Sequence, residues 1–318
     1  VNAKGQGPAW SNSLFEDNAE FGYGMLLAQK AIRDGLKTKV EAVMESEKAS
    51  DEVKAACKEW IDTFSVGATN GAATDKLVAA LEGCECDTCK DIVKNKDFLA
   101  KKSQWIFGGD GWAYDIGFGG VDHVLASGKD INIMVFDTEV YSNTGGQSSK
   151  STPTGAIAQF AAGGKETKKK DMASIAMSYG YVYVAQISMG ADFNQTVKAI
   201  AEAEAYPGPS LIIAYAPCIN HGIKKGMSKA QTEEELAVKC GYWHNFRFNP
   251  AAENKFTLDS KAPASEDYQA FLDGEVRYNS LKRSNPEKAA RLFAKNENEA
   301  KERYTYLNKL ITLYGKED

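Results

Sequence analysis

The sequence predicts an α/β fold, in which a doubly wound, mostly parallel sheet is flanked by helices and followed by a helical C-terminal tail. Between residues 104 and 217, apolar runs of strand length alternate with longer segments of helical periodicity. Because a crossover helix returns the chain to the same end of the sheet, strands joined in this way run parallel. Such sheets bind ligands at the carboxyl ends of their strands.

The first hundred residues are predicted to be mainly helical. Apolar residues recur at helical spacing in segments 14–35, 37–64 and 74–82. Segment 83–91, with the sequence GCECDTCKD, interrupts this periodicity and is expected to form a loop.

The alternating region supplies the sheet and the helices on its faces. The predicted strands cover residues 104–109, 131–137, 181–188 and 210–217. The predicted helices between them cover residues 112–127, 172–179 and 191–205.

Beyond residue 248 the chain becomes polar, and residues 267–318 are charged and helical, with Pro286 at a helix start. We therefore expect an α/β domain over residues 1–248. Residues 249–318 are expected to form a loop and a helical tail that packs on the same domain.

The composition excludes several classes of function. The chain has 318 residues, 43% of them hydrophobic, and a net charge of −5, so no surface for nucleic acid is expected. It has no apolar run that could cross a membrane, and no secretory signal opens it. Six cysteines in such a chain indicate reduced thiols and a cytoplasmic location. Because the first residue is Val1 rather than Met, we expect a fragment of a longer multidomain polypeptide.

Asp110 lies between Gly109 and Gly111, directly after the first predicted strand. A carboxylate suits Mg²⁺, which prefers oxygen ligands and is often shared with phosphate groups. Glycines let the backbone approach a phosphate without a Cβ in the way. The helix expected from Trp112 would point its N–H groups at the anion. A GDG sequence alone is more often a tight turn, so its meaning depends on a second motif.

The second motif follows the next predicted strand. Thr138 can offer a hydroxyl and Val140 a backbone carbonyl to the metal, and Asn143 can bond a phosphate or the reacting group. Asp110 and Asn143 are 33 positions apart (143 − 110), enough for one helix and one strand. The pair favours a metal-bound diphosphate at this edge of the sheet, and it is similar to the fingerprint of thiamine diphosphate enzymes.

Four segments carry a closer resemblance. They are GQGPAWSNSLFEDNAEFGYGM at 5–25, GDGWAYDIG at 109–117, VFDTEVYSNTGGQSSKSTPTG at 135–155 and YAPCINHG at 215–222. Together they resemble the thiamine-diphosphate-binding C-terminal region of the pyruvate:ferredoxin (flavodoxin) oxidoreductase family. The resemblance covers nearly the whole chain.

This resemblance assigns roles to residues of both motifs. It implies that Asp110, Thr138 and Val140 bind Mg²⁺ and that Asn143 takes part in catalysis. Thr138 stands where the commonest thiamine motif has asparagine, a variant that this family carries. The residues implied to contact thiamine diphosphate are Gly109, Asp110, Gly111, Trp112, Thr138, Val140, Tyr141, Ser142 and Asn143.

Cys218 follows the fourth predicted strand, and a cysteine there is ordinarily a small buried apolar residue. The resemblance implies instead that it binds a 4Fe–4S cluster, with the other three ligands lying upstream of Val1. The chain then supplies one thiolate of four. His221 would lie near this cluster and could tune it through a hydrogen bond.

Cys84, Cys86 and Cys89 form a CxCxxC motif that could bind zinc or an iron–sulfur cluster. A reduced surface loop is the favoured interpretation, because the family's cluster ligands are elsewhere. The basic segment 165–171, KETKKKD, is expected to be a solvated surface.

The implied activity is the oxidative decarboxylation of pyruvate with coenzyme A to acetyl-CoA and carbon dioxide. Electrons would pass through iron–sulfur clusters to ferredoxin or flavodoxin. The implied partners are the remaining domains of the same polypeptide and a second copy in a homodimer. Two alternatives stay open: a non-oxidative thiamine-dependent decarboxylase or synthase, and a non-catalytic scaffold module.

Overall fold

Two units make up the chain, and the larger one is built around a six-stranded sheet. The computed structural model describes residues 5, 7–13 and 15–315. Its contacts separate Val1–Phe21 with Trp105–Asp318 from a second unit, Gly22–Gln104. Of the opening segment 5–25, Gln6 and Leu14 lie outside the described residues, as does Val1.

The sheet has the order β1-β2-β4-β3-β5-β6. Its strands are β1 (Trp105–Gly109), β2 (Asn132–Asp137), β3 (Tyr183–Ile187), β4 (Ser210–Tyr215), β5 (Phe246–Phe248) and β6 (Phe256–Leu258). The first four pair in parallel, whereas β5 and β6 add antiparallel pairs at one edge. The central strands are apolar and buried on both faces, as parallel sheets require. The predicted mostly parallel α/β sheet is thus confirmed.

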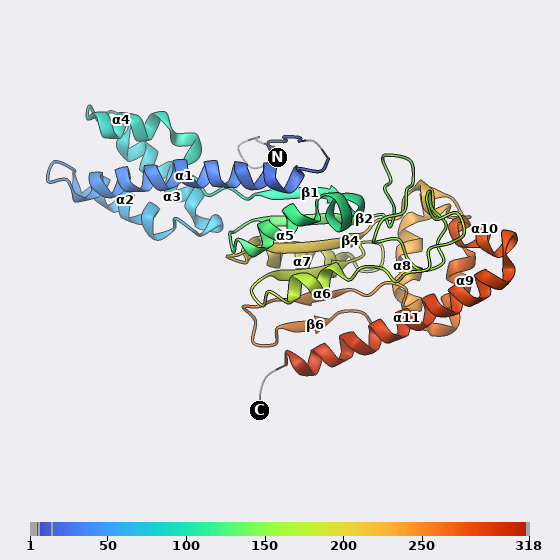
Figure 1. Cartoon of the computed structure of the whole chain (residues 1–318). Helices are drawn as coiled ribbons and strands as arrows, with labels where there is room; N and C mark the ends of the chain where they lie inside the picture. The colour runs from blue at the N-terminus through green and yellow to red at the C-terminus, as the bar shows by residue number, and fades with distance from the viewer. Residues whose placement is uncertain (1–4, 6, 14, 316–318) are drawn as a thin grey trace. The chain divides into compact units, whose positions relative to one another are not determined.

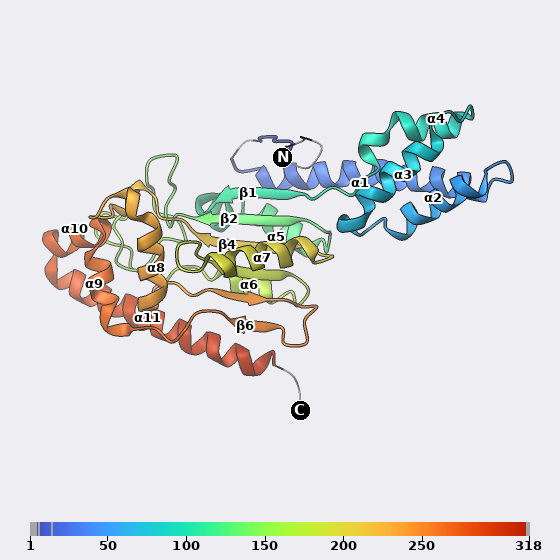
Figure 2. The same cartoon turned by 180° about the vertical axis from the view of Figure 1, so that it is seen from behind.

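Helices cover both faces of this sheet. Those that follow its strands are α5 (Phe118–Ala126), α6 (Met172–Met177) and α7 (Phe193–Ala205). In Figure 1, α5 and α6 lie in front of the sheet. Figure 2 shows α7 on the opposite face. This two-sided covering is the doubly wound arrangement.

The single helix predicted over 112–127 is wrong in one respect. The chain first forms a π-helical segment, Gly111–Ile116, in which the Gly117 N–H bonds to the Trp112 carbonyl at 2.8 Å. Only then does α5 begin. Such π segments often occur at functional sites, and this one starts directly after Asp110.

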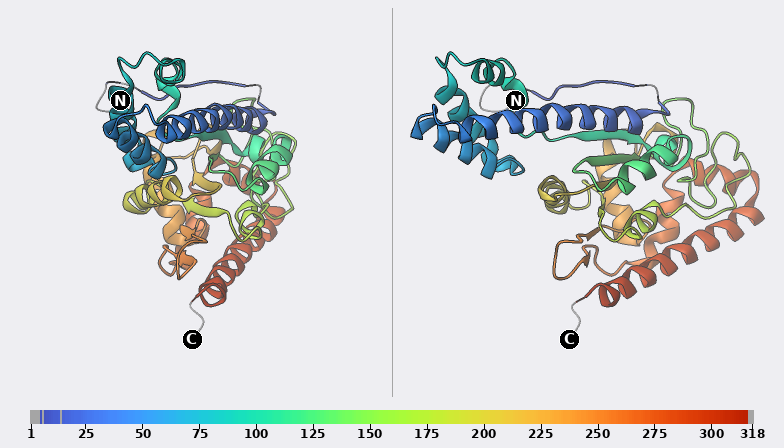
Figure 3. Two further views of the ribbon diagram at one scale, coloured as in Figure 1. Left: turned by 90° about the vertical axis from the view of Figure 1, so that its left-hand side faces the viewer. Right: turned by 60° about the vertical axis from the view of Figure 1, so that its left-hand side comes forward.

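The C-terminal part stays in the same unit as the sheet. It comprises α8 (Ala230–Cys240), α9 (Tyr268–Asp273), α10 (Val276–Ser284) and α11 (Pro286–Leu313). The side chain of Asn285 caps α11 and Pro286 occupies its first turn, a favoured place for proline. Figure 3 shows α11 as the long red helix near the C-terminal end, and α11 contacts β6.

The second unit is helical. It contains α1 from Gly22 onward (whole helix Asn18–Glu45), α2 (Asp51–Asp62), α3 (Gly67–Leu81) and α4 (Asp87–Lys94). Buried Trp60, Leu77 and Ile92 belong to its apolar core. The chain's remaining short 3₁₀ turns are Lys96–Phe98, Ile219–His221, Met227–Lys229 and Ser265–Asp267.

Two predictions for this unit are wrong. The helix expected over 37–64 is interrupted, because α1 ends at Glu45 and α2 begins only at Asp51. Ser50 caps α2, and its side chain accepts the Val53 N–H. The loop expected over 83–91 contains the start of α4, which Cys86 caps: its Sγ accepts the Cys89 N–H at 3.2 Å. Among the described residues, no helix combines the length and apolar character needed to cross a membrane.

Candidate cofactor site

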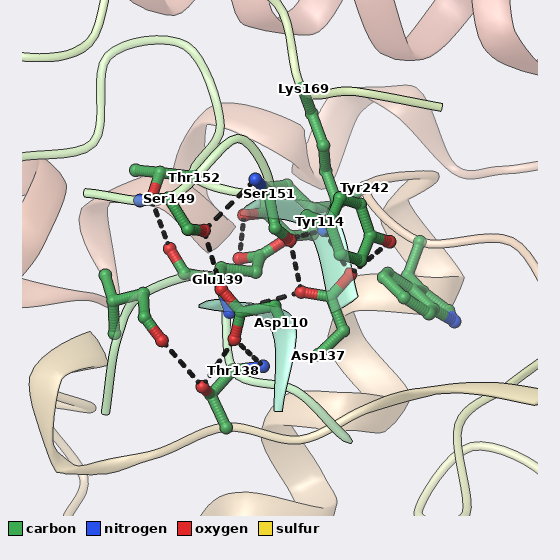
Figure 4. A network of polar contacts seen from close by, with 12 residues as sticks. Asp110, Tyr114, Asp137, Thr138, Glu139, Ser149, Ser151, Thr152, Lys169 and Tyr242 are labelled. Atoms are coloured by element: carbon green, nitrogen blue, oxygen red, sulfur yellow. Dashed lines mark hydrogen bonds and ion pairs between the residues drawn. The ribbon is translucent and has the colours of Figure 1, made fainter. Parts of the chain in front are cut away.

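The site lies where the parallel strands β1 and β2 end. Gly109 pairs with Phe136 across these strands, so the residues that follow each strand meet at one edge of the sheet. Asp110 therefore comes next to Thr138, and Figure 4 shows their side chains pointing toward one another. The sequence-predicted strand ends are brought together as expected for parallel neighbours.

Three oxygen atoms converge here. Thr138 Oγ1 lies 2.8 Å from Asp110 Oδ1 and 3.0 Å from the Val140 carbonyl oxygen. An octahedral Mg²⁺ with ligands near 2.1 Å has neighbouring oxygens about 3 Å apart. The hydroxyl has one proton and can donate to only one of these two acceptors. A cation would satisfy all three oxygens at once, so the donor set fits the predicted metal.

Asp110 is fully buried, and its charge has little compensation from protein groups. Burial, together with the nearby charge of Asp137, raises the pKa of the Asp110 carboxyl to about 7. Ser149 Oγ donates to Asp110 Oδ2 at 2.6 Å, and the Thr138 N–H donates to Oδ1 at 3.1 Å. A buried carboxylate that is held in place but poorly neutralised is a suitable ligand for a dication.

Asp137, at the end of β2, anchors the turn formed by residues 138–140. It accepts hydrogen bonds from Tyr114 Oη at 2.9 Å and from Ser151 Oγ, and it pairs with Lys169 Nζ at 2.8 Å. Its Oδ1 also accepts the Glu139 N–H at 3.1 Å. These bonds hold the backbone of Thr138 and Val140 in place. Figure 4 shows the bonds around Asp137.

Glu139 adopts a left-handed φ of 58°, which is strained for a residue with a side chain. Its buried carboxylate pairs with Lys169 and Arg277 at 2.8 and 2.7 Å and accepts from Tyr242 Oη at 2.6 Å. Burial alone would raise the pKa of Glu139, but the charges of Lys169 and Arg277 outweigh it and lower the pKa to about 2. The side chain is thus an ionised anchor that holds the turn.

The glycines of the first motif have different surroundings. A Cβ on Gly109 would meet nothing closer than the Phe136 carbonyl oxygen at 3.9 Å, which leaves room for a ligand. A Cβ on Gly111 would lie 2.5 Å from the ring of Tyr141. Trp112 is buried, and its ring fills the Cβ positions of both Gly108 and Gly117, at 2.2 Å each. Gly111 and Trp112 therefore pack within the fold, and their backbone is the part that could face a phosphate.

The second motif ends in a closed turn. Tyr141 bonds through its N–H to the Gln147 carbonyl at 2.9 Å, and the Gly146 N–H bonds back to the Tyr141 carbonyl at 2.8 Å. Ser142 is half-buried and Asn143 is exposed on this turn. Asn143 is thereby presented to solvent, where a ligand could reach it.

Cys218 is half-buried just beyond β4, at the same edge of the sheet. Its N–H donates to His221 Nδ1 at 3.0 Å, and His221 Nε2 lies 3.7 Å from Glu139 Oε2. Burial lowers the pKa of His221 well below its ordinary value. In addition, the Asn220 side chain occupies the space beside Gly146, with its Oδ1 2.7 Å from the Cβ position. The Cys218 segment therefore adjoins the turn that carries Asn143.

Sequence reasoning missed much of the supporting network. Lys169 belongs to the segment expected to be a solvated surface, yet it is paired inside the site. Lys165 likewise donates to the carbonyls of Ser149 and Thr152, at 2.9 and 2.6 Å. One signal of this network was present in the sequence, the hydroxyl-rich stretch 148–154. The apolar stretch at 172–177 was a second signal, but the three adjacent lysines at 168–170 made the segment look like a surface. The other residues missed are Tyr114, Asp137, Glu139, Ser149, Ser151, Tyr242 and Arg277.

Comparisons with known proteins identify relatives of this chain. Residues 93–214 match the family model described as "Thiamine pyrophosphate enzyme, C-terminal TPP binding domain". The chain is 58% identical to a pyruvate-flavodoxin oxidoreductase of Enterobacter agglomerans over 98% of its own length. Over nearly its whole length, the chain corresponds to a segment of the pyruvate:ferredoxin (flavodoxin) oxidoreductases.

Another relative, the pyruvate:ferredoxin oxidoreductase of Moorella thermoacetica, is 54% identical over 98% of this chain. The chain spans 27% of the length of each of these two relatives. A solved 2-oxoglutarate:ferredoxin oxidoreductase of Magnetococcus marinus is 19% identical, covering 56% of this chain and 66% of its own, with a TM-score of 0.36. That likeness is too weak to support the assignment, which depends on the sequence relatives.

Proposed function

We propose that this chain binds Mg²⁺ and thiamine diphosphate for a 2-oxo acid oxidoreductase. The proposed reaction converts pyruvate and coenzyme A to acetyl-CoA and carbon dioxide, and two electrons pass to ferredoxin or flavodoxin. The observation that carries the proposal is the convergence of oxygens from Asp110, Thr138 and Val140 at the edge of a parallel sheet. The similarity to these relatives supports the choice of thiamine diphosphate.

Each residue of the site has a definite task in this proposal. Asp110, Thr138 and Val140 would hold Mg²⁺ against the diphosphate, and the backbone at Gly109, Gly111 and Trp112 would donate N–H groups to it. Tyr141 and Ser142 would flank the cofactor. Asn143, exposed on its turn, would donate a hydrogen bond to the substrate.

The bound cofactor supplies an electron sink for the negative charge left when pyruvate loses carbon dioxide. The contribution of this chain is to bind and orient. Lys169, Arg277 and Asp137 keep the 138–140 turn rigid, so that the ligand oxygens hold their positions.

Cys218 would supply one of four thiolates to a 4Fe–4S cluster, with the others coming from the remaining domains of the same polypeptide. Its half-buried position beside the site supports that role. The length of the relatives supports the existence of further domains. We extend the proposal to a homodimer located in the cytoplasm.

A titration of Mg²⁺ and thiamine diphosphate, followed by calorimetry, tests the cofactor site. Asp110→Asn preserves the shape of the side chain and removes its charge, so it should weaken binding at least about 100-fold. Asp122→Asn is the control. Asp122, on α5, accepts a hydrogen bond from Tyr179 Oη, and the amide oxygen of asparagine can accept the same bond. Equal affinity in the two variants would refute the ligand assignment.

Two other functions make different predictions in the full polypeptide that carries this chain. A non-oxidative decarboxylase or synthase would release carbon dioxide from pyruvate without an electron acceptor and would be indifferent to Cys218→Ser. A non-catalytic scaffold module would fail to bind the cofactor. The proposed oxidoreductase needs an added low-potential acceptor, and Cys218→Ser should retain cofactor but lose cluster signal in electron paramagnetic resonance.

A further inference from the structure

Three cysteines lie close together in the helical unit, in the loop between α3 and α4 and in the first turn of α4. The Sγ atoms of Cys84, Cys86 and Cys89 all lie within 4.8 Å of one another. Cys89 is buried, Cys84 is half-buried and Cys86 is exposed, so the three thiols form a gradient from the core to solvent. The described cysteines are all free thiols.

The backbone forms this arrangement without help from a ligand. Gly83 takes a left-handed φ of 91° and turns the chain after α3, and the Cys84 N–H bonds to the Leu81 carbonyl at 3.1 Å. Cys86 then caps α4 by accepting the Cys89 N–H. Leu81 and Ile92 are buried in one core, so the two helices on either side of the loop are fixed by packing.

The spacing of the sulfurs selects the class of ligand. Thiolates bind zinc at about 2.3 Å, which places two sulfurs on one ion about 4 Å apart. A separation within 4.8 Å needs only a small contraction to meet this value. The thiolates of a four-iron cube bind different iron atoms and must stand farther apart, and such a cube takes four of them.

We propose that Cys84, Cys86 and Cys89 bind one zinc ion, with the fourth position open on the exposed side of Cys86. Zinc suits this set because it prefers thiolates and tetrahedral coordination. Binding exchanges thiol protons for the ion, with no change of oxidation state. A disulfide between any two of the cysteines would leave the third without a partner sulfur, whereas one ion uses all three.

A zinc ion bound here would link the loop after α3 to the first turn of α4. A small unit with a single core gains stability from a bound metal, because the ion binds the folded form. Zinc should therefore raise the melting temperature of this unit and leave the sheet unit unchanged.

The test uses the whole 318-residue chain, purified with thiols reduced and titrated with zinc chloride against a chromophoric chelator. We expect about one zinc per chain, with three sulfur neighbours near 2.3 Å in X-ray absorption. Replacement by Co²⁺ should give a thiolate-to-cobalt charge-transfer band. Cys86→Ser should lower zinc affinity at least about tenfold and remove one sulfur from the shell.

Two variants separate the effect on folding from the effect on zinc binding. Serine is a good N-cap, so Cys86→Ser keeps the start of α4, and its helical circular dichroism should match that of the original chain. Cys218→Ser removes a half-buried thiol from the other unit and should keep the zinc stoichiometry. The proposal is overturned if no zinc is retained, if zinc has no sulfur neighbours, if iron and sulfide occupy the loop, or if these cysteines form a disulfide under the same conditions.

Discussion

Glu139 and Arg277 are 138 residues apart in the sequence, yet Glu139 Oε2 and Arg277 Nη2 form a buried ion pair at 2.7 Å. Arg277 also binds Glu275, with Nε at 2.6 Å from its carboxylate. The pair joins the turn after β2 to the beginning of α10. It holds the left-handed Glu139, and with it the adjacent carbonyl of Val140, in place.

Removing Arg277 should be costly. Arg277→Met leaves the buried Glu275 without its ion-pair partner and leaves Glu139 with Lys169 alone, so we expect the free energy of unfolding to fall by about 3–5 kcal/mol. The matched control is Arg291→Met, since Arg291 is 59% exposed and lies 3.5 Å from Glu166; its loss should cost less than about 1 kcal/mol. Urea unfolding measures both, and equal losses would contradict the anchoring role.

The Thr138 hydroxyl should matter for the metal more than for the fold. Thr138→Val keeps the branched shape but removes one of the three converging oxygens, so Mg²⁺-dependent binding of thiamine diphosphate should weaken at least about tenfold. Thr144→Val is the control, because Thr144 is exposed on the neighbouring turn and its hydroxyl donates to Gln147. Calorimetry at fixed cofactor and varied Mg²⁺ gives the comparison. A similar effect of both variants would mean that the loop, and not the oxygen, is responsible.

Two glycines near the start of α5 should respond oppositely to alanine. A Cβ on Gly117 would lie 2.2 Å from the Trp112 ring, which is confined by its burial, so Gly117→Ala should cost about 1–3 kcal/mol of stability. Gly119 has nothing within 4 Å of its Cβ position, and it lies inside the helix. Gly119→Ala should therefore be neutral or stabilise by up to about 1 kcal/mol. Thermal unfolding that ranks the pair in the reverse order would show that Trp112 can move aside.

His244 should give the chain an acid-sensitive contribution to stability. It is buried against Tyr304, and burial, with the nearby charge of Arg303, lowers its pKa from 6.5 to about 4. Between these two values the unfolded chain binds the extra proton, so stability falls as pH decreases from 6.5 to 4. The loss should reach about 3 kcal/mol at most.

Unfolding in urea at several pH values isolates this contribution. His244→Phe keeps an aromatic ring and cannot be protonated, so the dependence of stability on pH in this window should become shallower. His123→Gln, which replaces an exposed histidine on α5, should retain the slope of the original chain. An unchanged slope in His244→Phe would assign the acid sensitivity to other groups.

The sequence predicted the sheet and the central part of the site because both depend on local patterns. Apolar runs identify strands, and residues directly after parallel strands must meet, which is why Asp110 could be paired with Thr138 in advance. The supporting residues could not be found in this way. Arg277 reaches Glu139 from a distant helix, and no periodicity links the two. Lys169 lies between Lys168 and Lys170 in the sequence, and such a run of charge is typical of an exposed surface.

The N-terminal helices show a different limit. Their periodicity was visible, but nothing in it indicated that Gly22–Gln104 forms a unit of its own. The boundary between α3 and α4 was also hidden, because a cysteine is an uncommon N-cap and the CxCxxC motif suggested a loop.

The contacts from Glu139 to His221 and from His221 to the backbone of Cys218 would have a consequence for the proposed electron transfer. Tunnelling rates fall steeply with separation, so an enzyme benefits when donor and acceptor are mounted on one rigid part. Here a single ionised carboxylate supports both the metal turn and the segment bearing the prospective cluster thiolate. In the proposed function, the packing of His221 against Glu139 would make the spacing between the two centres a property of the core, insulated from substitutions on the surface.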